Sequence, residues 1–204
     1  MNIKCFFLCC ILFISCKDDK GKEKLGVIES PSVADSMYPF LFNNGSELFM
    51  SWTQKINDSV YSVNFSSLRN QEWSKPIEIA KGNDWFVNWA DFPAIAVNKE
   101  NILTHFLQKS DPETFAYNVH LKLSNDKGKH WKDDFLMHTD STKTEHGFVT
   151  LLPYQEDSFF VTWLDGRNTG GGSHDEEHSS HGAMNIRAAT VLASGEIIDD
   201  RLID

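Results

Sequence analysis

Short runs of alternating apolar and polar residues dominate the chain from about residue 37 onward. Residues 118–123 (Asn-Val-His-Leu-Lys-Leu) alternate at a period of two, which is typical of a β-strand with one buried face. Turn-forming residues interrupt every run, and long segments with a helical period of about 3.6 residues are missing from the sequence. The pattern therefore predicts an all-β protein.

The strand pattern repeats three times along the chain. Residues 39–54 align without a gap on residues 93–108, and residues 149–165 follow the same pattern with different turn residues. Each copy contains a strand, a polar turn and a second strand, and further strand-like runs follow it. A repeat with four strands per unit is typical of β-propeller blades. We therefore expect three four-stranded blades, at about residues 37–80, 88–138 and 145–204.

One turn motif stands out in the second predicted blade. Residues 124–131 fit the pattern Ser-x-Asp-x-Gly-x-x-Trp in full, with Ser124, Asp126, Gly128 and Trp131 at the fixed positions. The aspartate can accept backbone N–H bonds in the turn, and the glycine can adopt a positive φ at no steric cost. The tryptophan can fold back over the hairpin with a large apolar face. The motif therefore predicts a tight hairpin with a structural role.

This octapeptide resembles the Asp-box, or BNR repeat, of sialidases and related β-propellers. In that family the box closes the hairpin between the third and fourth strands of a blade and lies far from the active site. Residues 66–73 superpose on it in degenerate form, with Leu68 in place of the aspartate and Asn70 in place of the glycine. The resemblance implies a sialidase-like, six-bladed β-propeller, of which about three blades are present. We expect an N-terminal fragment of a longer propeller, and self-association of two half-rings is the alternative.

The resemblance to sialidases can be tested at one catalytic motif. The family uses a tyrosine nucleophile paired with a glutamate, an acid/base aspartate and three arginines that bind the sialate carboxylate. The first arginine belongs to an Arg-Ile-Pro motif, but the corresponding segment 36–39 is Ser-Met-Tyr-Pro, with Met37 at the arginine position. The tyrosine, the glutamate and the later arginines normally lie in blades beyond these three. The resemblance therefore implies a relative of exo-α-sialidases without complete catalytic machinery in this chain.

Four charged residues are candidates for a catalytic or ligand-binding site. Asp91 lies in the aromatic segment 85–93, which either brings a sugar-stacking surface to the mouth of the propeller funnel or packs between blades. Asp165 and Arg167 follow the second strand of the third blade, where they form either a surface ion pair or part of a site for an acidic ligand. Arg187 is a further candidate for binding an acidic ligand.

The glycine-rich segment 168–182 concentrates three histidines beside three carboxylates. Imidazole and carboxylate together suit zinc or another divalent transition ion. No motif such as His-Glu-x-x-His is present, so a solvated insertion without a metal is the alternative. The candidate metal ligands are His174, His178, His181 and, at the start of the third blade, His146.

The N-terminus predicts a lipid-anchored protein. A short basic segment, residues 1–4, precedes an apolar run, residues 5–14, that is too short to span a bilayer. The run ends in the sequence Phe-Ile-Ser-Cys, residues 13–16, which resembles a bacterial lipobox and makes residues 1–16 a signal peptide with Cys16 as the lipidated residue. Two or more acyl chains give firm membrane anchoring. We therefore expect the protein at the bacterial outer membrane or cell surface.

Composition narrows the domain organisation and the partners. All four cysteines lie in residues 1–16, so the mature chain has no disulfide framework. Residues 17–33 are polar and predict a tether, and residues 34–204 form the partial propeller. A net charge of -10 without a basic stripe argues against nucleic acid. The expected partners are the membrane and sialylated or other glycans. A non-catalytic binding scaffold and a metal-dependent propeller enzyme remain alternatives.

Overall fold

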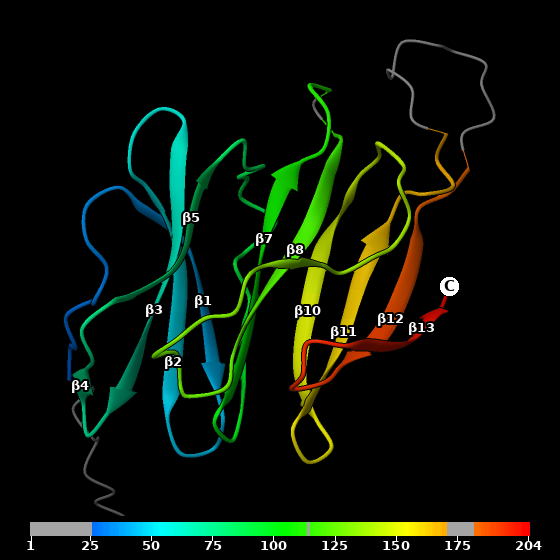
Figure 1. Ribbon diagram of the computed structural model, residues 1–204. Helices are drawn as coiled ribbons and strands as arrows, with labels where there is room; N and C mark the ends of the chain where they lie inside the picture. The colour runs from blue at the N-terminus through cyan, green and yellow to red at the C-terminus, as the bar shows by residue number, and fades with distance from the viewer. Residues whose placement is uncertain (1–25, 114, 171–181) are drawn as a thin grey trace, which may run out of the picture.

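The computed structural model describes residues 26–113, 115–170 and 182–204, and within these ranges the chain forms thirteen β-strands (Figure 1). The first sheet contains β1 (Ser36–Asn43), β2 (Leu48–Lys55), β3 (Val60–Arg69), β4 (Glu72–Trp73) and β5 (Ile77–Asn83). The second contains β6 (Ile95–Asn98), β7 (Asn101–Lys109), β8 (Tyr117–Ser124) and β9 (Phe135–Leu136). The third contains β10 (His146–Tyr154), β11 (Ser158–Asp165), β12 (Asn185–Val191) and β13 (Ile197–Leu202).

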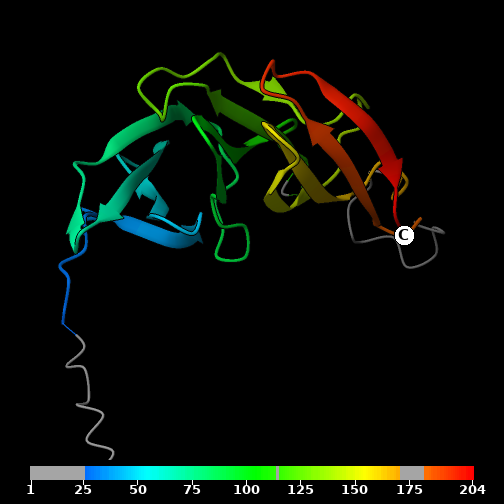
Figure 2. The same cartoon turned by 90° about the horizontal axis from the view of Figure 1, so that it is seen from below.

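Each sheet is an antiparallel meander, which confirms the predicted all-β propeller architecture with three blades. Neighbouring strands in a sheet follow one another along the chain, and in the first sheet both β4 and β5 pair with β3. The three sheets stand side by side along an arch (Figure 2), with β1 on the concave side and β13 on the convex side. In the described part of the chain, no helix has the length and apolarity needed to cross a bilayer.

The middle blade is buried on both faces because it lies between the other two. The first seven residues of β7 are buried without alternation, unlike a strand with one solvated face. One apolar cluster joins the first blade to the second, and another joins the second to the third. Phe40 and Phe42 of β1 pack against both clusters. The core therefore lies in the two seams between blades.

The Asp-box lies between β8 and β9, the third and fourth strands of the second blade. The Ser124 hydroxyl accepts the Gly128 N–H at 2.9 Å, and a carboxylate oxygen of Asp126 accepts the His130 N–H at 2.9 Å. Gly128 has a φ of +80°. The Trp131 indole meets the Phe65 ring of the first blade edge-on, with centroids 6.0 Å apart. The box therefore packs one blade against the next.

The predicted signal peptide with Cys16, the first part of the tether and the three loop histidines, His174, His178 and His181, all lie outside the described residues.

Candidate functional site

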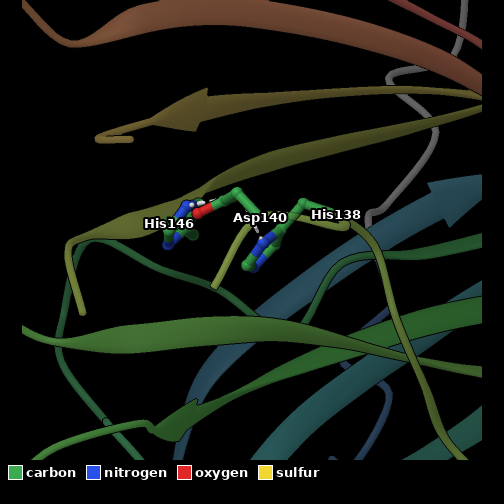
Figure 3. Close-up of side chains that lie close together, drawn as sticks. All are labelled: His138, Asp140 and His146. Atoms are coloured by element: carbon green, nitrogen blue, oxygen red, sulfur yellow. Dashed lines mark hydrogen bonds and ion pairs between the residues drawn. The ribbon is translucent and has the colours of Figure 1, made fainter. Parts of the chain in front are cut away.

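A group of charged and imidazole side chains lies at the seam between the second and third blades. His146 opens β10 and pairs with Asp165, which closes β11. The connection from β9 to β10 brings His138 and Asp140 to the same point (Figure 3), and Arg167 follows β11. We refer to these five residues as the seam cluster. Strand ends of the third blade and the connection that enters it from the second blade therefore build the site.

Asp165 forms the buried base of the cluster, and Arg167 binds it from the more exposed side. Arg167 binds Asp165 through two bonds of 2.7 Å, from Nε to Oδ1 and from Nη2 to Oδ2. The Trp163 indole N–H donates to Asp165 Oδ2 at 2.8 Å. Burial raises the pKa of Asp165, but the hydrogen bonds from Arg167 and Trp163 outweigh it and lower that pKa to about 2. The predicted ion pair of Asp165 and Arg167 is therefore present, but its expected place at the surface is wrong, because the Asp165 side chain is fully buried.

Asp140 is the carboxylate on which the cluster converges. Its Oδ2 atom lies 2.8 Å from His138 Nδ1, 3.3 Å from His146 Nε2 and 3.3 Å from Arg167 Nη2. The Thr142 hydroxyl donates to its other oxygen, Oδ1. Burial opposes ionisation, but Thr142 and the two imidazoles lower the pKa of Asp140 below its ordinary value. The side chains of Asp140 and Arg167 keep 12% and 21% of their surface exposed, so these two are the accessible members.

The two imidazole rings stack on each other, with centroids 3.8 Å apart and planes inclined by 6°. Both side chains are fully buried. Burial, followed by the charge of His146, lowers the pKa of His138 to about 4. His146 Nδ1 lies 3.2 Å from the Tyr117 carbonyl oxygen and 3.1 Å from the Thr144 carbonyl oxygen. Because both are acceptors, the network assigns the hydrogen to Nδ1, and Nε2 faces Asp140 and Asp165.

Asp91 and Glu145 extend the site beyond the seam cluster. Asp91 accepts the backbone N–H of Phe148 at 2.6 Å, across the seam between blades. The Tyr117 hydroxyl donates to Glu145 at 2.6 Å, and burial raises the pKa of Tyr117. Gly147 lies between them, because an added Cβ would come within 2.9 Å of Asp91 Oδ1 and 3.2 Å of Tyr117 Cε2. The backbone therefore has to approach Asp91 closely here, which only glycine permits.

Two inner strands carry the same strained bulge. The register of β1 shifts between Met37 and Phe40, and the register of β10 shifts between Gly147 and Thr150. Tyr38 and Phe148 lie inside these bulges with φ values of +56° and +51°. Aromatic residues rarely adopt this conformation, and such strain gathers at functional sites. Phe148 is 47% exposed, and its backbone N–H is the group that donates to Asp91.

The structure brings together some of the residues that the sequence singled out and separates others. Asp91, Asp165, Arg167 and His146 converge on the seam. Arg187 lies apart from them on β12 and pairs with Asp200 of β13 at 2.7 Å.

The aromatic segment before β6 also divides into two parts. Trp85 is buried and stacks on Phe106 with centroids 4.4 Å apart. The alternative prediction, that this segment packs between blades, is wrong for Trp89, because Trp89 is 77% exposed. Only one of the two tryptophans is therefore free to meet a ligand.

His138 and Asp140 are the members that sequence reasoning missed. Both lie in residues 138–146 (His-Thr-Asp-Ser-Thr-Lys-Thr-Glu-His), which connect the last strand of one blade to the first strand of the next. Two histidines and two carboxylates within nine residues were a detectable signal. The metal hypothesis was placed on the glycine-rich segment instead, because that segment has three histidines within eight residues and residues 138–146 have two.

Comparisons with known proteins support the fold alone. No protein-family model matches the sequence, and no curated protein matches it either. An α-L-arabinanase of Penicillium chrysogenum, solved with arabinobiose, is 15% identical to this chain, with a TM-score of 0.55. The match covers 81% of this chain and 49% of the arabinanase. A GH93 α-L-arabinofuranosidase of Fusarium graminearum, also with arabinobiose, is 12% identical with a TM-score of 0.51, covering 77% of this chain and 45% of its own.

The NanB sialidase of Streptococcus pneumoniae also matches, at 14% identity and a TM-score of 0.45, covering 81% of this chain and 23% of its own. A TM-score of that size is too low to carry an argument about the present chain. The chain spans about half the length of the two arabinan-type enzymes, at 49% and 45%. The protein therefore has the fold of part of a propeller glycoside hydrolase.

Proposed function

We propose that the protein is a glycan-directed propeller that binds a neutral oligosaccharide at the seam between the second and third blades. The observation that carries the proposal is the charge balance there. Two carboxylates, those of Asp140 and Asp165, contact the single guanidinium group of Arg167, and two more, those of Asp91 and Glu145, bind Phe148 and Tyr117 beside them. Sugar hydroxyl groups can donate to the carboxylates and accept from the arginine.

The same charge balance disfavours sialic acid as the ligand. A sialate carboxylate needs free guanidinium forks, but both Asp165 and Asp140 already contact Arg167. Met37 also stands at the position where a sialidase carries its first arginine. Excess negative charge repels an anionic sugar and leaves a neutral one unaffected. We therefore assign the site to neutral glycans, although sialidases are the family that the Asp-box resembles.

Two further observations support a saccharide. Two half-exposed aromatic residues lie next to Asp91. Phe92, 43% exposed, follows it in the sequence, and Phe148, 47% exposed, donates its backbone N–H to it. Aromatic rings of this kind can cover the apolar face of a sugar. Two enzymes that share the fold at TM-scores above 0.5, the arabinanase and the GH93 arabinofuranosidase, were solved with arabinobiose.

Binding to oligosaccharides tests the proposal directly. We expect the full chain to bind a neutral oligosaccharide such as arabinobiose or xylotriose in titration calorimetry, and to show no comparable affinity for sialyllactose. Asp140→Asn should weaken this binding by at least about tenfold, because the exposed carboxylate loses its charge. Arg187→Gln is the matched control, since its ion pair with Asp200 lies on the outer strands of the same blade.

Each outcome of this experiment decides something. Preference for sialyllactose would overturn the choice of a neutral ligand. Absence of binding to every saccharide would favour the alternative of a protein-binding scaffold. Equal losses in Asp140→Asn and Arg187→Gln would place the ligand away from the seam. Release of reducing sugar from arabinan, abolished in Asp140→Asn, would extend the proposal from binding to hydrolysis.

We also propose that the protein is a lipoprotein of the bacterial outer membrane or cell surface, anchored through Cys16. The support comes from the N-terminal sequence, in which a basic segment and an apolar run precede the lipobox-like Phe-Ile-Ser-Cys. A surface position would give the propeller access to extracellular glycans.

A further inference from the structure

Trp89 is the most exposed aromatic residue in the described part of the chain, with 77% of its surface open to solvent. Tryptophan carries a large apolar surface and is buried to a high degree in most proteins. A single exposed apolar side chain is nevertheless common at protein surfaces. What distinguishes Trp89 is the support that the surrounding chain gives it.

The turn that carries Trp89 is held from within and from the neighbouring blade. Asn88 Oδ1 accepts the backbone N–H groups of Ala90 at 2.7 Å and of Asp91 at 3.2 Å, and Asn88 Nδ2 donates to Asp91 Oδ2 at 2.7 Å. The other oxygen of Asp91, Oδ1, accepts the Phe148 N–H of the third blade at 2.6 Å. Trp89 therefore extends into solvent from a turn that is braced on both sides.

The residues that precede the turn are anchored in the core. Trp85 stacks on Phe106, with ring centroids 4.4 Å apart. Phe86 stacks on Tyr117, with centroids 4.0 Å apart and planes inclined by 8°. Two aromatic residues of this segment therefore serve packing, whereas the ring of Trp89 is left open to solvent on a fixed support.

The turn lies next to the seam cluster, at one end of the second blade. The carbonyl oxygen of Asp84 accepts the Lys109 N–H at 2.8 Å, and the carbonyl oxygen of Thr144 accepts the Tyr117 N–H at 3.2 Å. Lys109 and Tyr117 are paired with each other across β7 and β8. The connection that enters β6, which contains the turn at residues 88–91, and the connection that enters β10 therefore run side by side.

We infer that Trp89 forms a second saccharide subsite, on which one ring of a neutral oligosaccharide stacks while a neighbouring ring occupies the seam cluster. The inference rests on the proposed function and deepens it, because it requires a ligand of at least two sugar units. An indole face covers the apolar face of a sugar ring and leaves the hydroxyl groups in water. The braced turn keeps the cost of ordering this ring on binding low.

Titration calorimetry of the full chain with arabinobiose tests the inference. We expect Trp89→Ala to weaken binding by at least about tenfold, and Trp89→Phe, which keeps an aromatic face, by no more than about threefold. Tyr154→Ala is the matched control, because Tyr154 is also an exposed aromatic residue, at 42%, but lies at the opposite end of β10 from the seam cluster.

Two further measurements separate stacking from a general effect on the fold. Asn88→Ala leaves the indole in place but removes the brace, so we expect it to weaken binding as well. Binding of arabinobiose should change the tryptophan fluorescence of the wild type, and this change should be lost in Trp89→Phe although that variant still binds. Circular dichroism verifies that each variant is folded.

The outcomes distinguish this inference from the function on which it rests. Equal affinity for arabinobiose in Trp89→Ala and in the wild type would overturn the subsite, and weakened binding in Asp140→Asn would then leave the proposed function intact. Equal losses in Trp89→Ala and Tyr154→Ala would also overturn it, because the effect would not be local to the turn. Absence of saccharide binding in the wild type would overturn both.

Discussion

At the scale of single residues, the degree of burial decides how much an ion pair contributes to stability. Lys55 and Asp58 form an ion pair of 2.9 Å on the surface, where water screens the charges and the contribution to stability is small. Asp165 and Arg167 form bonds of 2.7 Å around a carboxylate that is fully buried. Removing one partner there leaves a buried charge alone. The seam cluster is therefore a structural element of the fold as well as a candidate site.

His105 makes the fold sensitive to acid. Its ring is buried, Nε2 accepts the Ala94 N–H at 3.2 Å, and burial lowers its pKa to about 4. The unfolded chain, with a pKa of about 6.5, therefore takes up a proton first as the pH falls. We expect stability to decline from about pH 6.5 and to level off below about pH 4, by up to about 3 kcal/mol.

Urea unfolding at a series of pH values measures this effect. His105→Gln should make the decline between pH 6.5 and pH 4 shallower without abolishing it, because His138, the other buried histidine with a pKa of about 4, still titrates. His130→Gln is the surface control, since the His130 side chain is 89% exposed. A wild-type profile that is flat over this range would show that His105 is not buried as described.

At the scale of elements, the Asp-box shows how one turn serves two blades. Its serine and aspartate satisfy backbone N–H groups inside the turn, and its tryptophan packs on Phe65 of the preceding blade. Asn125 also donates to the Ala193 carbonyl oxygen, in the turn between β12 and β13, at 3.0 Å. A hairpin motif that looks local in sequence therefore connects all three sheets.

Two glycines with similar backbone conformations separate these contributions. Gly128 has a φ of +80° and Gly45 a φ of +92°, so alanine is strained at both. A Cβ at Gly45 meets open space, whereas one at Gly128 comes within 2.5 Å of Phe65 Cζ. We expect Gly45→Ala to cost about 1 kcal/mol and Gly128→Ala about 1–3 kcal/mol more.

Thermal or urea unfolding of the two variants provides the comparison. The difference between them reports the packing of the box against the first blade, because the backbone cost is shared. Equal losses would mean that the box stabilises only its own hairpin.

At the scale of the whole molecule, the seams decide both stability and function. Each sheet alone has two faces to cover, and only the middle one has both covered by other blades. The candidate site lies on a seam as well, since its residues come from β10, β11 and the connection after β9. Packing between blades and the geometry of the site are therefore coupled.

Anchoring of the whole molecule at a membrane is testable through one residue. In a bacterium that processes lipoproteins, we expect the full chain to lose its first 15 residues and to carry lipid on Cys16, as the N-terminal sequence predicts. Mass spectrometry of the N-terminal peptide detects both changes. Cys16→Ser should abolish them and release the protein from the membrane fraction, while Cys10→Ser should not. An unmodified Cys16 in the wild type would contradict the proposal.

The sequence by itself determined the class of fold. Period-two alternation, frequent turn residues and a threefold repeat predict antiparallel blades, because these features are local and the backbone responds to them directly. The Asp-box predicts a hairpin for the same reason. Candidate residues at strand ends, such as Asp165 and His146, were also recognisable, since polar groups after buried strands stand out.

Only the tertiary structure decided which of these residues meet. Asp91 contacts Phe148 across 57 positions, and His138 and Asp140 reach His146 from a connection with no regular pattern. Arg167 and Arg187 look equivalent in sequence, yet one enters the seam and the other pairs on the outer strands. Such contacts depend on how blades pack on one another, and interblade packing leaves no period in the sequence. The strands are therefore a local property of this chain, and the site is a property of its assembled blades.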